Sequence, residues 1–260
     1  MAVVSALLDI IGVSKRFGGL TAVKEVSFAV EAGQICSLIG PNGAGKTTLF
    51  NLISAVFRPS TGQILFDGRD LTKLPTHALA RLGIARTFQN LAVFKHETVV
   101  DNILVGMHTR LRTDAISAAV FFRARAEEIK ARERVEEIID FLEIEDIRDH
   151  TVGSLSYGLQ KRVELGRALA ISPKLLLLDE MVSGMNQEER EDIARFILDL
   201  KEELGMTILM VEHDMGIVMD ISDHVCVMNE GRKIAEGTPA QVALNEAVVA
   251  AYLGAKRAAA

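Results

Sequence analysis

The sequence predicts an α/β fold with a mostly parallel core sheet, an N-terminal antiparallel β layer and an inserted helical subdomain. Two uninterrupted apolar runs of strand length, 175–178 and 207–211, predict parallel strands covered on both faces. Between them, residues 187–204 have apolar side chains at helical spacing and end before Gly205. Strand, helix and strand in this order form the unit of a doubly wound sheet.

The N-terminal region predicts the antiparallel layer. Residues 26–30 alternate between apolar and polar side chains, as in a strand with one buried face. Residues 62–68 place a short apolar run between two glycines, which predicts a strand closed by a turn.

The middle third of the chain predicts helices. Residues 123–143 are dense in charge, yet Val135, Ile138, Ile139 and Leu142 recur at i, i+3, i+4 and i+7. This is the pattern of a helix with one buried stripe. We interpret most of the charges as its solvated face and not as a nucleic-acid surface.

Composition and charge exclude several classes of protein. No run reaches the roughly 18 apolar residues that cross a bilayer, and residues 1–10 lack the basic start of a secretory signal, so we expect a cytoplasmic protein. The net charge of −6 argues against nucleic-acid binding. Cys36 and Cys226 lie in apolar runs, and we expect both to be small buried side chains.

The strongest signal is the segment 40–47, which fits G-x-x-x-x-G-K-[ST], follows the apolar run 35–39 and precedes the apolar-patterned segment 48–53. Its glycines let backbone N–H groups point at phosphate oxygens, and the next helix adds the positive end of its dipole. Lys46 is expected to reach the β- and γ-phosphates of ATP, and the Thr47 hydroxyl to bind Mg²⁺. The residues predicted to hold the nucleotide here are Asn42, Gly43, Ala44, Gly45, Lys46, Thr47 and Thr48. The fold is therefore predicted to be a P-loop nucleotide-binding domain.

Two carboxylates, Asp179 and Glu180, follow the apolar run 175–178. Ligands of open α/β sheets bind at the carboxyl ends of the strands, so we expect both side chains beside the phosphate loop. Asp179 suits binding Mg²⁺, directly or through water. Glu180 suits polarising the water that attacks ATP.

Four more places match a known pattern. Gln89 follows Lys46 by 43 positions, residues 155–159 read Leu-Ser-Tyr-Gly-Leu, His213 comes soon after the run 207–211, and Phe17 lies in Arg-Phe-Gly-Gly. With the phosphate loop, these features resemble the ATP-binding-cassette (ABC) ATPases over nearly the whole chain.

The resemblance implies a role for each residue. Gln89 contacts Mg²⁺ and senses the γ-phosphate, His213 is the switch histidine, and Phe17 stacks on adenine, although an ordinary core aromatic is the alternative for Phe17. The other histidines are interpreted as surface or hydrogen-bonded residues: His77, His96, His108, His150 and His224.

Residues 155–159 resemble the ABC signature. In this family the signature serine and glycine, here Ser156 and Gly158, cover ATP that is bound to a partner subunit. The resemblance therefore implies a second ATP-binding subunit, identical or closely related, that pairs head to tail around two nucleotides.

Four residues depart from the common ABC pattern: Tyr157 and Leu159 in the signature, Met181 after the catalytic glutamate, and Asn186 in the following D-loop. Substituted signatures and an asparagine D-loop resemble the ATP-binding subunits of branched-chain amino acid importers. Residues 211–215, 234–239 and 248–254 carry the same resemblance.

The function predicted from this resemblance is ATP hydrolysis that energises import of branched-chain or other hydrophobic amino acids. Integral membrane permease subunits and, indirectly, an extracytoplasmic substrate-binding protein are the implied partners. The chain is then expected to lie peripherally on the inner face of the cell membrane.

Other functions stay open. Urea importers and lipopolysaccharide exporters have similar cassettes. A soluble ABC protein that acts on ribosomes or DNA is opposed by the single cassette, the lack of a long coiled-coil insertion and the negative charge. A degenerate cassette that only binds ATP is opposed by the retained Lys46, Glu180 and His213.

We divide the chain into four parts. Residues 1–89 are the nucleotide-binding core with the antiparallel layer and phosphate loop, and residues 90–160 are the inserted helical subdomain that ends in the signature. Residues 161–240 are the rest of the core. Residues 241–260 are a C-terminal helical tail, whose alanine-rich end from Ala255 is expected to fray.

Residues 90–125 are predicted to dock on a membrane subunit. They carry more apolar groups than a small helical insert readily buries, and exposed apolar patches mark partner sites. The groups in question are Leu91, Val93, Phe94, Phe121 and Phe122. The alternative is that they pack against the stripe of residues 135–142.

Overall fold

The computed structural model describes residues 6–87, 91–107 and 121–258, and residues 1–5, 88–90, 108–120 and 259–260 lie outside this description. The strands are β1 (Ala6–Phe17), β2 (Leu20–Glu31), β3 (Ile35–Ile39), β4 (Thr61–Phe66), β5 (Arg69–Asp70), β6 (Ile84–Arg86), β7 (Leu175–Asp179), β8 (Thr207–Val211), β9 (His224–Asn229) and β10 (Arg232–Gly237). The helices are α1 (Lys46–Ile53), α2 (Thr76–Leu82), α3 (Val99–Gly106), α4 (Phe121–Phe141), α5 (Tyr157–Leu169), α6 (Gln187–Glu202), α7 (Met215–Ile221), α8 (Pro239–Ala243) and α9 (Glu246–Ala258), with short 3₁₀ helices η3 (Glu145–Ile147) and η4 (Val152–Ser154).

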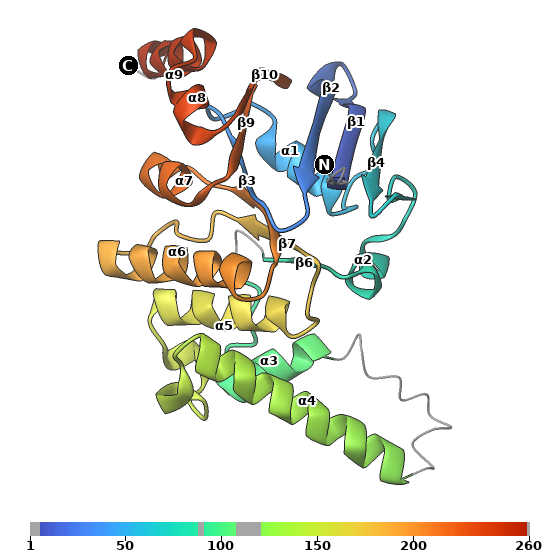
Figure 1. Ribbon diagram of the computed structural model, residues 1–260, viewed down its shortest axis with the longest axis vertical. Helices are drawn as coiled ribbons and strands as arrows, with labels where there is room; N and C mark the ends of the chain where they lie inside the picture. The colour runs from blue at the N-terminus through green and yellow to red at the C-terminus, as the bar shows by residue number, and fades with distance from the viewer. Residues whose placement is uncertain (1–5, 88–90, 108–120, 259–260) are drawn as a thin grey trace.

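Two sheets form the core of the molecule (Figure 1). The larger sheet has the strand order β10-β9-β3-β8-β7-β6, and all its neighbours run parallel except β9 and β10. The smaller sheet, β2-β1-β4-β5, is antiparallel throughout. The predicted fold class, with its parallel core and N-terminal antiparallel layer, is confirmed.

The central strands β3, β7 and β8 are buried along their whole length. Along β7, Leu176 and Leu178 belong to one hydrophobic core with α5 and α6. Leu175 and Leu177 belong to a second core with the antiparallel sheet and α1. Both faces of the larger sheet are therefore covered, which explains why these runs contain no polar alternation.

Helix α6 connects β7 to β8 and completes the predicted strand–helix–strand unit. Its predicted apolar face is buried, with Ile193, Phe196, Ile197 and Leu200 in the core. The helix ends at Glu202, two residues earlier than predicted, and the chain turns at Gly205, which has a φ of 61°.

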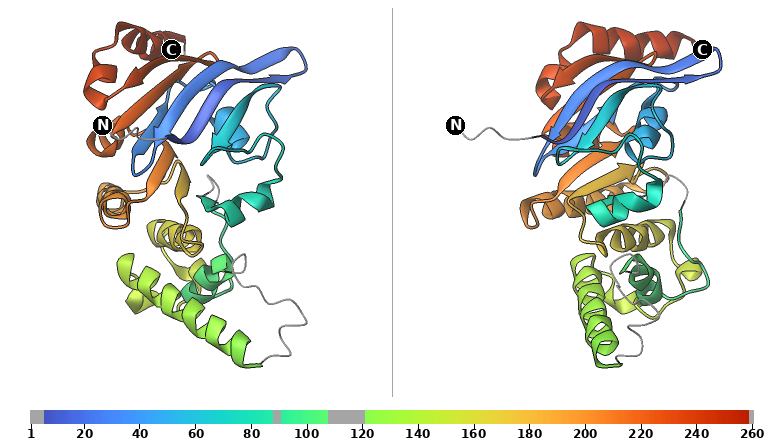
Figure 2. Two further views of the ribbon diagram at one scale, coloured as in Figure 1. Left: turned by 45° about the vertical axis from the view of Figure 1, so that its right-hand side comes forward. Right: turned by 90° about the vertical axis from the view of Figure 1, so that its right-hand side faces the viewer.

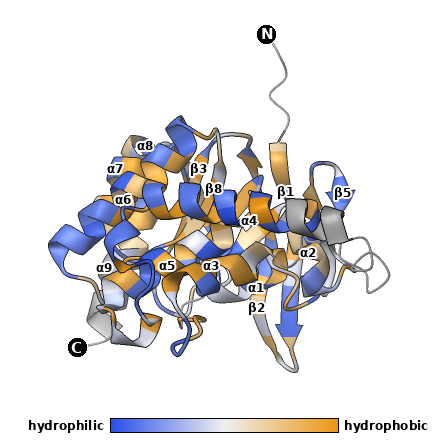
Figure 3. Cartoon of the chain, turned by 90° about the horizontal axis from the view of Figure 1, so that it is seen from below, coloured by the Kyte–Doolittle hydropathy of each residue, from blue (hydrophilic) through white to orange (hydrophobic). Residues whose placement is uncertain are grey.

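The inserted helices α3 and α4 lie away from the sheets, and α5 lies between them and the larger sheet (Figure 2). The predicted apolar stripe, which consists of Val135, Ile138 and Ile139 of α4 and of Leu142 just after it, is buried in the main core. Much of the rest of the described part of α4 is hydrophilic (Figure 3). Helices α3 and α5 pack so closely at Gly106 that a Cβ on this residue would lie 2.4 Å from the Arg167 carbonyl oxygen. The subdomain boundary at residue 160 stays a prediction, since α5 crosses it.

The C-terminal part consists of α8 and α9. Helix α9 runs through Ala258, so the helix extends past Ala255, where the end of the chain was expected to fray. Alanine has the highest helix propensity of all residues, which accounts for the difference. Cys36 and Cys226 are free and buried, as predicted. Across the described ranges, no helix combines the length and apolar character of a membrane span.

Candidate functional site

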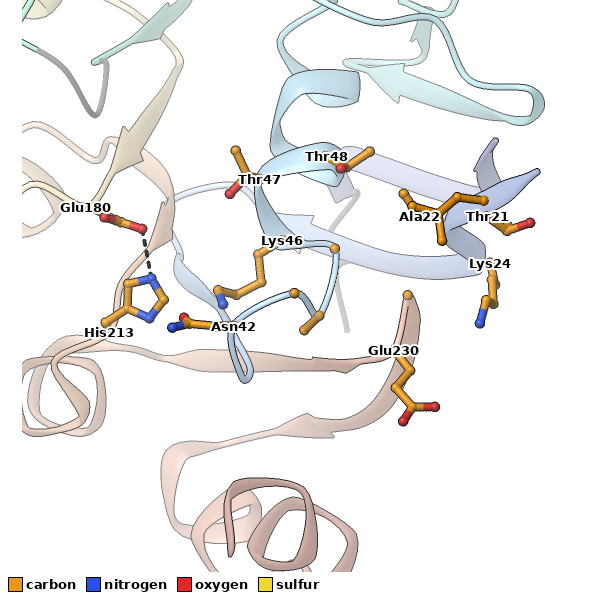
Figure 4. A pocket seen from close by; sticks show the side chains of 15 residues that line it. Thr21, Ala22, Lys24, Asn42, Lys46, Thr47, Thr48, Glu180, His213 and Glu230 are labelled. Atoms are coloured by element: carbon orange, nitrogen blue, oxygen red, sulfur yellow. Dashed lines mark hydrogen bonds and ion pairs between the residues drawn. The ribbon is translucent and has the colours of Figure 1, made fainter. Parts of the chain in front are cut away.

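The carboxyl ends of β3, β7 and β8 meet at one edge of the larger sheet. Leu38 of β3 pairs with Val211 of β8, and Val211 pairs with Asp179 of β7. The phosphate loop, Glu180 and His213 therefore start from neighbouring positions. A cleft of about 690 Å³ opens there (Figure 4). Its lining residues are Leu20, Thr21, Ala22, Lys24, Asn42, Gly43, Ala44, Gly45, Lys46, Thr47, Thr48, Glu180, His213, Glu230 and Gly231.

The phosphate loop is held tightly between β3 and α1. A Cβ on Gly40 would lie 2.1 Å from the Met228 carbonyl oxygen, and one on Gly45 would lie 2.4 Å from that of Ala22. Gly45 also has a φ of 97°, which disfavours other residues. These contacts fix the loop against β9 and β2, so that the N-terminus of α1 opens on the cleft, where it can bind an anion.

Lys46 lies within the loop and is almost fully buried. Its Nζ donates hydrogen bonds to the carbonyl oxygens of Gly40 at 2.7 Å and Pro41 at 3.1 Å. Burial lowers the pKa of Lys46, and the carboxylate of Glu180 acts in the opposite direction. A cation is thus held where it can bind the phosphates of a nucleotide.

Glu180, which follows β7, and His213, which comes after β8, form a pair at one end of the cleft. Glu180 Oε1 lies 2.8 Å from His213 Nε2, and both side chains lie on the side of Lys46 and Thr47 (Figure 4). The backbone of Glu180 has a φ of 50°, uncommon for a residue with a side chain, and its N–H donates to the Val211 carbonyl oxygen at 2.9 Å. A carboxylate and an imidazole placed in this way can polarise a water molecule.

Asp179 lies deeper and does not line the cleft. Its Oδ2 accepts a hydrogen bond from Arg86 Nη2 at 2.8 Å. Arg86 also donates to Asn51 Oδ1 at 2.8 Å and lies over the ring of Phe50. The sequence motifs do not mark Arg86, which ties the end of β7 to α1 through β6.

The wall opposite Glu180 was not predicted from the sequence. It comes from the start of β2 and the turn between β9 and β10: Leu20, Thr21, Ala22, Lys24, Glu230 and Gly231. The Lys24 N–H donates to the Gly231 carbonyl oxygen at 2.7 Å and holds these two segments together. The turn at Gly18 and Gly19 indicates a hairpin, but no local signal connects that hairpin with Gly231.

Phe17 and Gln89, which were predicted near the nucleotide, are not among the described residues that line the cleft. Phe17 ends β1, is 42% exposed, and contacts Phe57 edge to face with the ring centroids 5.3 Å apart. It does not line the cleft, so stacking of adenine on Phe17 stays a prediction. Gln89 lies outside the described residues.

The signature residues also lie apart from the cleft of their own chain. Ser156 caps α5 by accepting a hydrogen bond from the Leu159 N–H at 3.3 Å. A Cβ on Gly158 would lie 2.4 Å from Glu189 Oε1. The Tyr157 ring lies against Gly184. The signature therefore contacts the loop that leads from Glu180 to α6.

Two of the residues that depart from the ABC pattern have structural roles in this chain. Asn186 caps α6 by accepting from the Glu189 N–H at 2.9 Å, and Glu189 accepts from the Asn186 N–H in return, which is a complete capping box. Met181 is fully buried in the main core. Both residues thus stabilise the loop after Glu180.

Comparison with known proteins gives consistent results. A family model described as ABC transporter matches residues 23–183, and one described as branched-chain amino acid ATP-binding cassette transporter matches residues 232–258. The chain is 42% identical over 251 residues to the high-affinity branched-chain amino acid transport ATP-binding protein BraF of Pseudomonas aeruginosa, covering 95% of this chain and 98% of BraF.

Two solved structures extend the comparison. The ADP conformation of MJ1267, an ATP-binding cassette of an ABC transporter, has a TM-score of 0.84 and 33% identity over 96% of this chain and 99% of that one. A dimeric post-hydrolysis structure of the cassette MJ0796, bound to ADP and Pi, has a TM-score of 0.76 and 25% identity over 89% of this chain and 98% of that one.

Proposed function

The chain belongs to the ABC transporter family of ATP-binding proteins, and from this premise we propose that it hydrolyses ATP to energise import of branched-chain amino acids. The observation that carries the ATPase function is the Glu180–His213 pair, with 2.8 Å between its polar atoms, in the cleft that also holds Lys46. The BraF relative and the family match at residues 232–258 support the substrate class.

The site residues have distinct roles in this proposal. Residues 42–48 bind the phosphates through backbone N–H groups, and Lys46 exchanges its loop carbonyls for phosphate oxygens. Glu180 orients the attacking water, and His213 fixes the Glu180 carboxylate and approaches the γ-phosphate. Adenosine lies toward the wall that contains Leu20 and Lys24.

The donor set fits Mg²⁺. The Thr47 hydroxyl lines the cleft, and the carboxylate of Asp179 stands at the end of β7 on the same edge of the sheet, which gives the hard oxygen ligands that Mg²⁺ prefers. When bound, the ion neutralises phosphate charge. Arg86 holds one oxygen of Asp179 and thereby fixes the orientation of that carboxylate. Gln89 is proposed as a further ligand from the resemblance alone.

A second ATP-binding subunit completes each site in this proposal. Ser156 and Gly158 lie outside the cleft of their own chain and at the start of α5, so in this proposal the nucleotide that they contact is bound to another subunit. The dimeric MJ0796 structure with ADP and Pi supports this arrangement.

Permease subunits in the membrane and an extracytoplasmic substrate-binding protein are the other proposed partners, which would place the chain on the cytoplasmic face. Docking is proposed for the exposed part of residues 90–125. Phe94 is 50% exposed, and Val105 lines an apolar hollow of about 350 Å³ between α2, α3 and α5. Val93 packs on the core and Leu91 is half-buried, while the side chains of Phe121 and Phe122 lie outside the description.

Uptake in host cells that lack the gene tests the function. The parent chain should restore uptake of labelled leucine, isoleucine and valine. Glu180→Gln should bind ATP but restore neither turnover nor uptake, because it removes the carboxylate while preserving its size. The matched control is Glu191→Gln, an exposed position on α6, which should restore both. Restored uptake of urea in place of the labelled amino acids would contradict the substrate class, and turnover by Glu180→Gln would contradict the mechanism.

A further inference from the structure

Glu212 is a buried carboxylate to which no motif assigns a role. It stands between Val211, the last residue of β8, and His213, and it is only 4% exposed. Its Oε1 accepts a hydrogen bond from the Val182 N–H at 3.2 Å. The N–H groups of Met181 and His213 also interact with this carboxylate. One side chain therefore binds backbone groups of two loops.

These two loops carry the reactive pair. Met181 and Val182 follow Glu180 directly, and His213 follows Glu212 itself. The Glu180 backbone is in the left-handed region, and its own N–H is held by the Val211 carbonyl oxygen. The hydrogen bonds of Glu212 thus fix the chain on the far side of Glu180, so that Glu180 is held from both directions.

The position is costly for a carboxylate. Burial raises the pKa of Glu212 to about 7, against the opposite effect of the three backbone N–H groups, and the neighbouring Glu180 raises it further. Within the described chain, no cation is among the groups that act on it. Asp179, by contrast, has Arg86 as a partner. A side chain that only filled space here would be more stable without charge.

We propose that Glu212 is a positioning residue of the ATPase, which holds the turn after Glu180 against the loop of His213 and so sets the 2.8 Å contact between them. This inference rests on the proposed function. A misplacement of about 1 Å in such a pair lowers turnover by up to about 100-fold.

Three substitutions separate geometry from charge. Glu212→Gln keeps an acceptor at the same reach, Glu212→Asp keeps the charge but is one methylene too short for the Val182 N–H, and Glu212→Ala removes both. We expect kcat within about threefold of the parent for Gln, and about 10- to 100-fold lower for Asp and Ala, with the dissociation constant of ATP unchanged within about threefold. The control is Asp223→Asn, because the Asp223 carboxylate also accepts a backbone N–H, that of Ile35, but at the start of β3, away from the cleft.

Amide hydrogen exchange gives a readout that is independent of turnover. Peptides covering residues 180–185 and 212–215 should lose protection in the Asp and Ala variants, while the phosphate-loop peptide keeps its protection. If Ala fails to fold, the comparison of Asp with Gln decides. A kcat for Asp equal to or above that of Gln, or unchanged protection of residues 180–185 in Asp, would overturn the proposal. Failure of the parent chain to hydrolyse ATP would instead refute the proposed function.

Discussion

Lys46 donates a hydrogen bond to the carbonyl oxygen of Gly40 at 2.7 Å, so the cation of the phosphate loop is bound by the loop itself. Phosphate oxygens are stronger acceptors for a lysine than backbone carbonyls, because they are charged. The arrangement keeps Lys46 in place before a nucleotide binds, which limits the ordering that binding requires.

Substitution Lys46→Ala should therefore weaken both binding and turnover, because the ammonium compensates phosphate charge in the ground state and the transition state alike. Loss of a charge-assisted contact of about 2 kcal/mol corresponds to a dissociation constant about thirtyfold higher. Equilibrium titration with a fluorescent ATP analogue measures this dissociation constant. The control is Lys73→Ala, an exposed lysine that does not line the cleft. An unchanged affinity for Lys46→Ala would mean that the phosphate loop has been misinterpreted.

Ser156 provides a test of the arrangement between subunits. In the Glu180→Gln background, ATP should trap a dimer, and adding Ser156→Arg should remove that dimer by placing a bulky side chain at the partner's nucleotide. The monomer should still bind ATP, since Ser156 does not line its own cleft. Size-exclusion chromatography with light scattering measures the dimer, and we expect its fraction to fall at least about tenfold. Loss of ATP binding in the monomer would show that Ser156 acts within its own chain.

Glu212 makes a defined contribution to the pH dependence of stability. Its pKa is about 7 in the folded protein and 4.5 in an ordinary glutamate, so the folded state binds the extra proton between these values. The contribution of Glu212 to the free energy of unfolding is greatest below about pH 4.5 and is lost as the pH rises through about 7. The total loss is up to about 3 kcal/mol.

Urea unfolding of the parent and of Glu212→Gln at pH 5, 6, 7 and 8 checks this sign. Glutamine cannot ionise, so the variant should gain stability relative to the parent as the pH rises. A stability difference between the two proteins that does not change with pH would contradict it.

The sequence predicted some parts of the fold closely and others not at all. The bounds of β3 and β8 match because both strands are buried on both faces, so that each appears as an uninterrupted apolar run. The predicted end of α6 was less accurate, because the last turn of a helix depends on local capping. The side chains of Glu180 and His213 come together because their strands are parallel neighbours, which follows from the βαβ pattern.

The rest of the site depends on contacts between distant parts of the chain. Leu20 and Lys24 reach the cleft because the antiparallel sheet folds over the phosphate loop and bonds to Gly231, and no local pattern encodes that contact. Arg86 is similar, because its carboxylate partner Asp179 lies far along the chain. Glu212 precedes the predicted residue His213. Its proposed role depends on a hydrogen bond from the Val182 N–H, in a loop about 30 residues earlier, and the sequence does not indicate that contact.

Phe94 offers the sharpest test of permease docking. Its N–H donates to Asn102 Oδ1 at 2.8 Å, and its carbonyl oxygen accepts from Asn102 Nδ2 at 3.0 Å, with Asn102 fully buried. The backbone of Phe94 is thus fixed, while half of its side chain is exposed to solvent. A rigidly held, exposed aromatic side chain is a favourable anchor for a partner, because binding costs little conformational entropy.

Substitution Phe94→Glu should lower stability by no more than about 1 kcal/mol and leave basal ATPase unchanged, because half of the side chain is already exposed to solvent. It should abolish uptake in the assembled transporter, since a charge would enter an apolar contact. Leu244→Glu is the matched control, because Leu244 is 84% exposed at the end of α8 and should keep uptake. Val93→Glu should instead destabilise the protein, because Val93 packs on the core. Uptake at the parent rate by a folded Phe94→Glu variant would exclude Phe94 from the docking surface, and loss of its basal ATPase would assign Phe94 to the internal structure of the cassette.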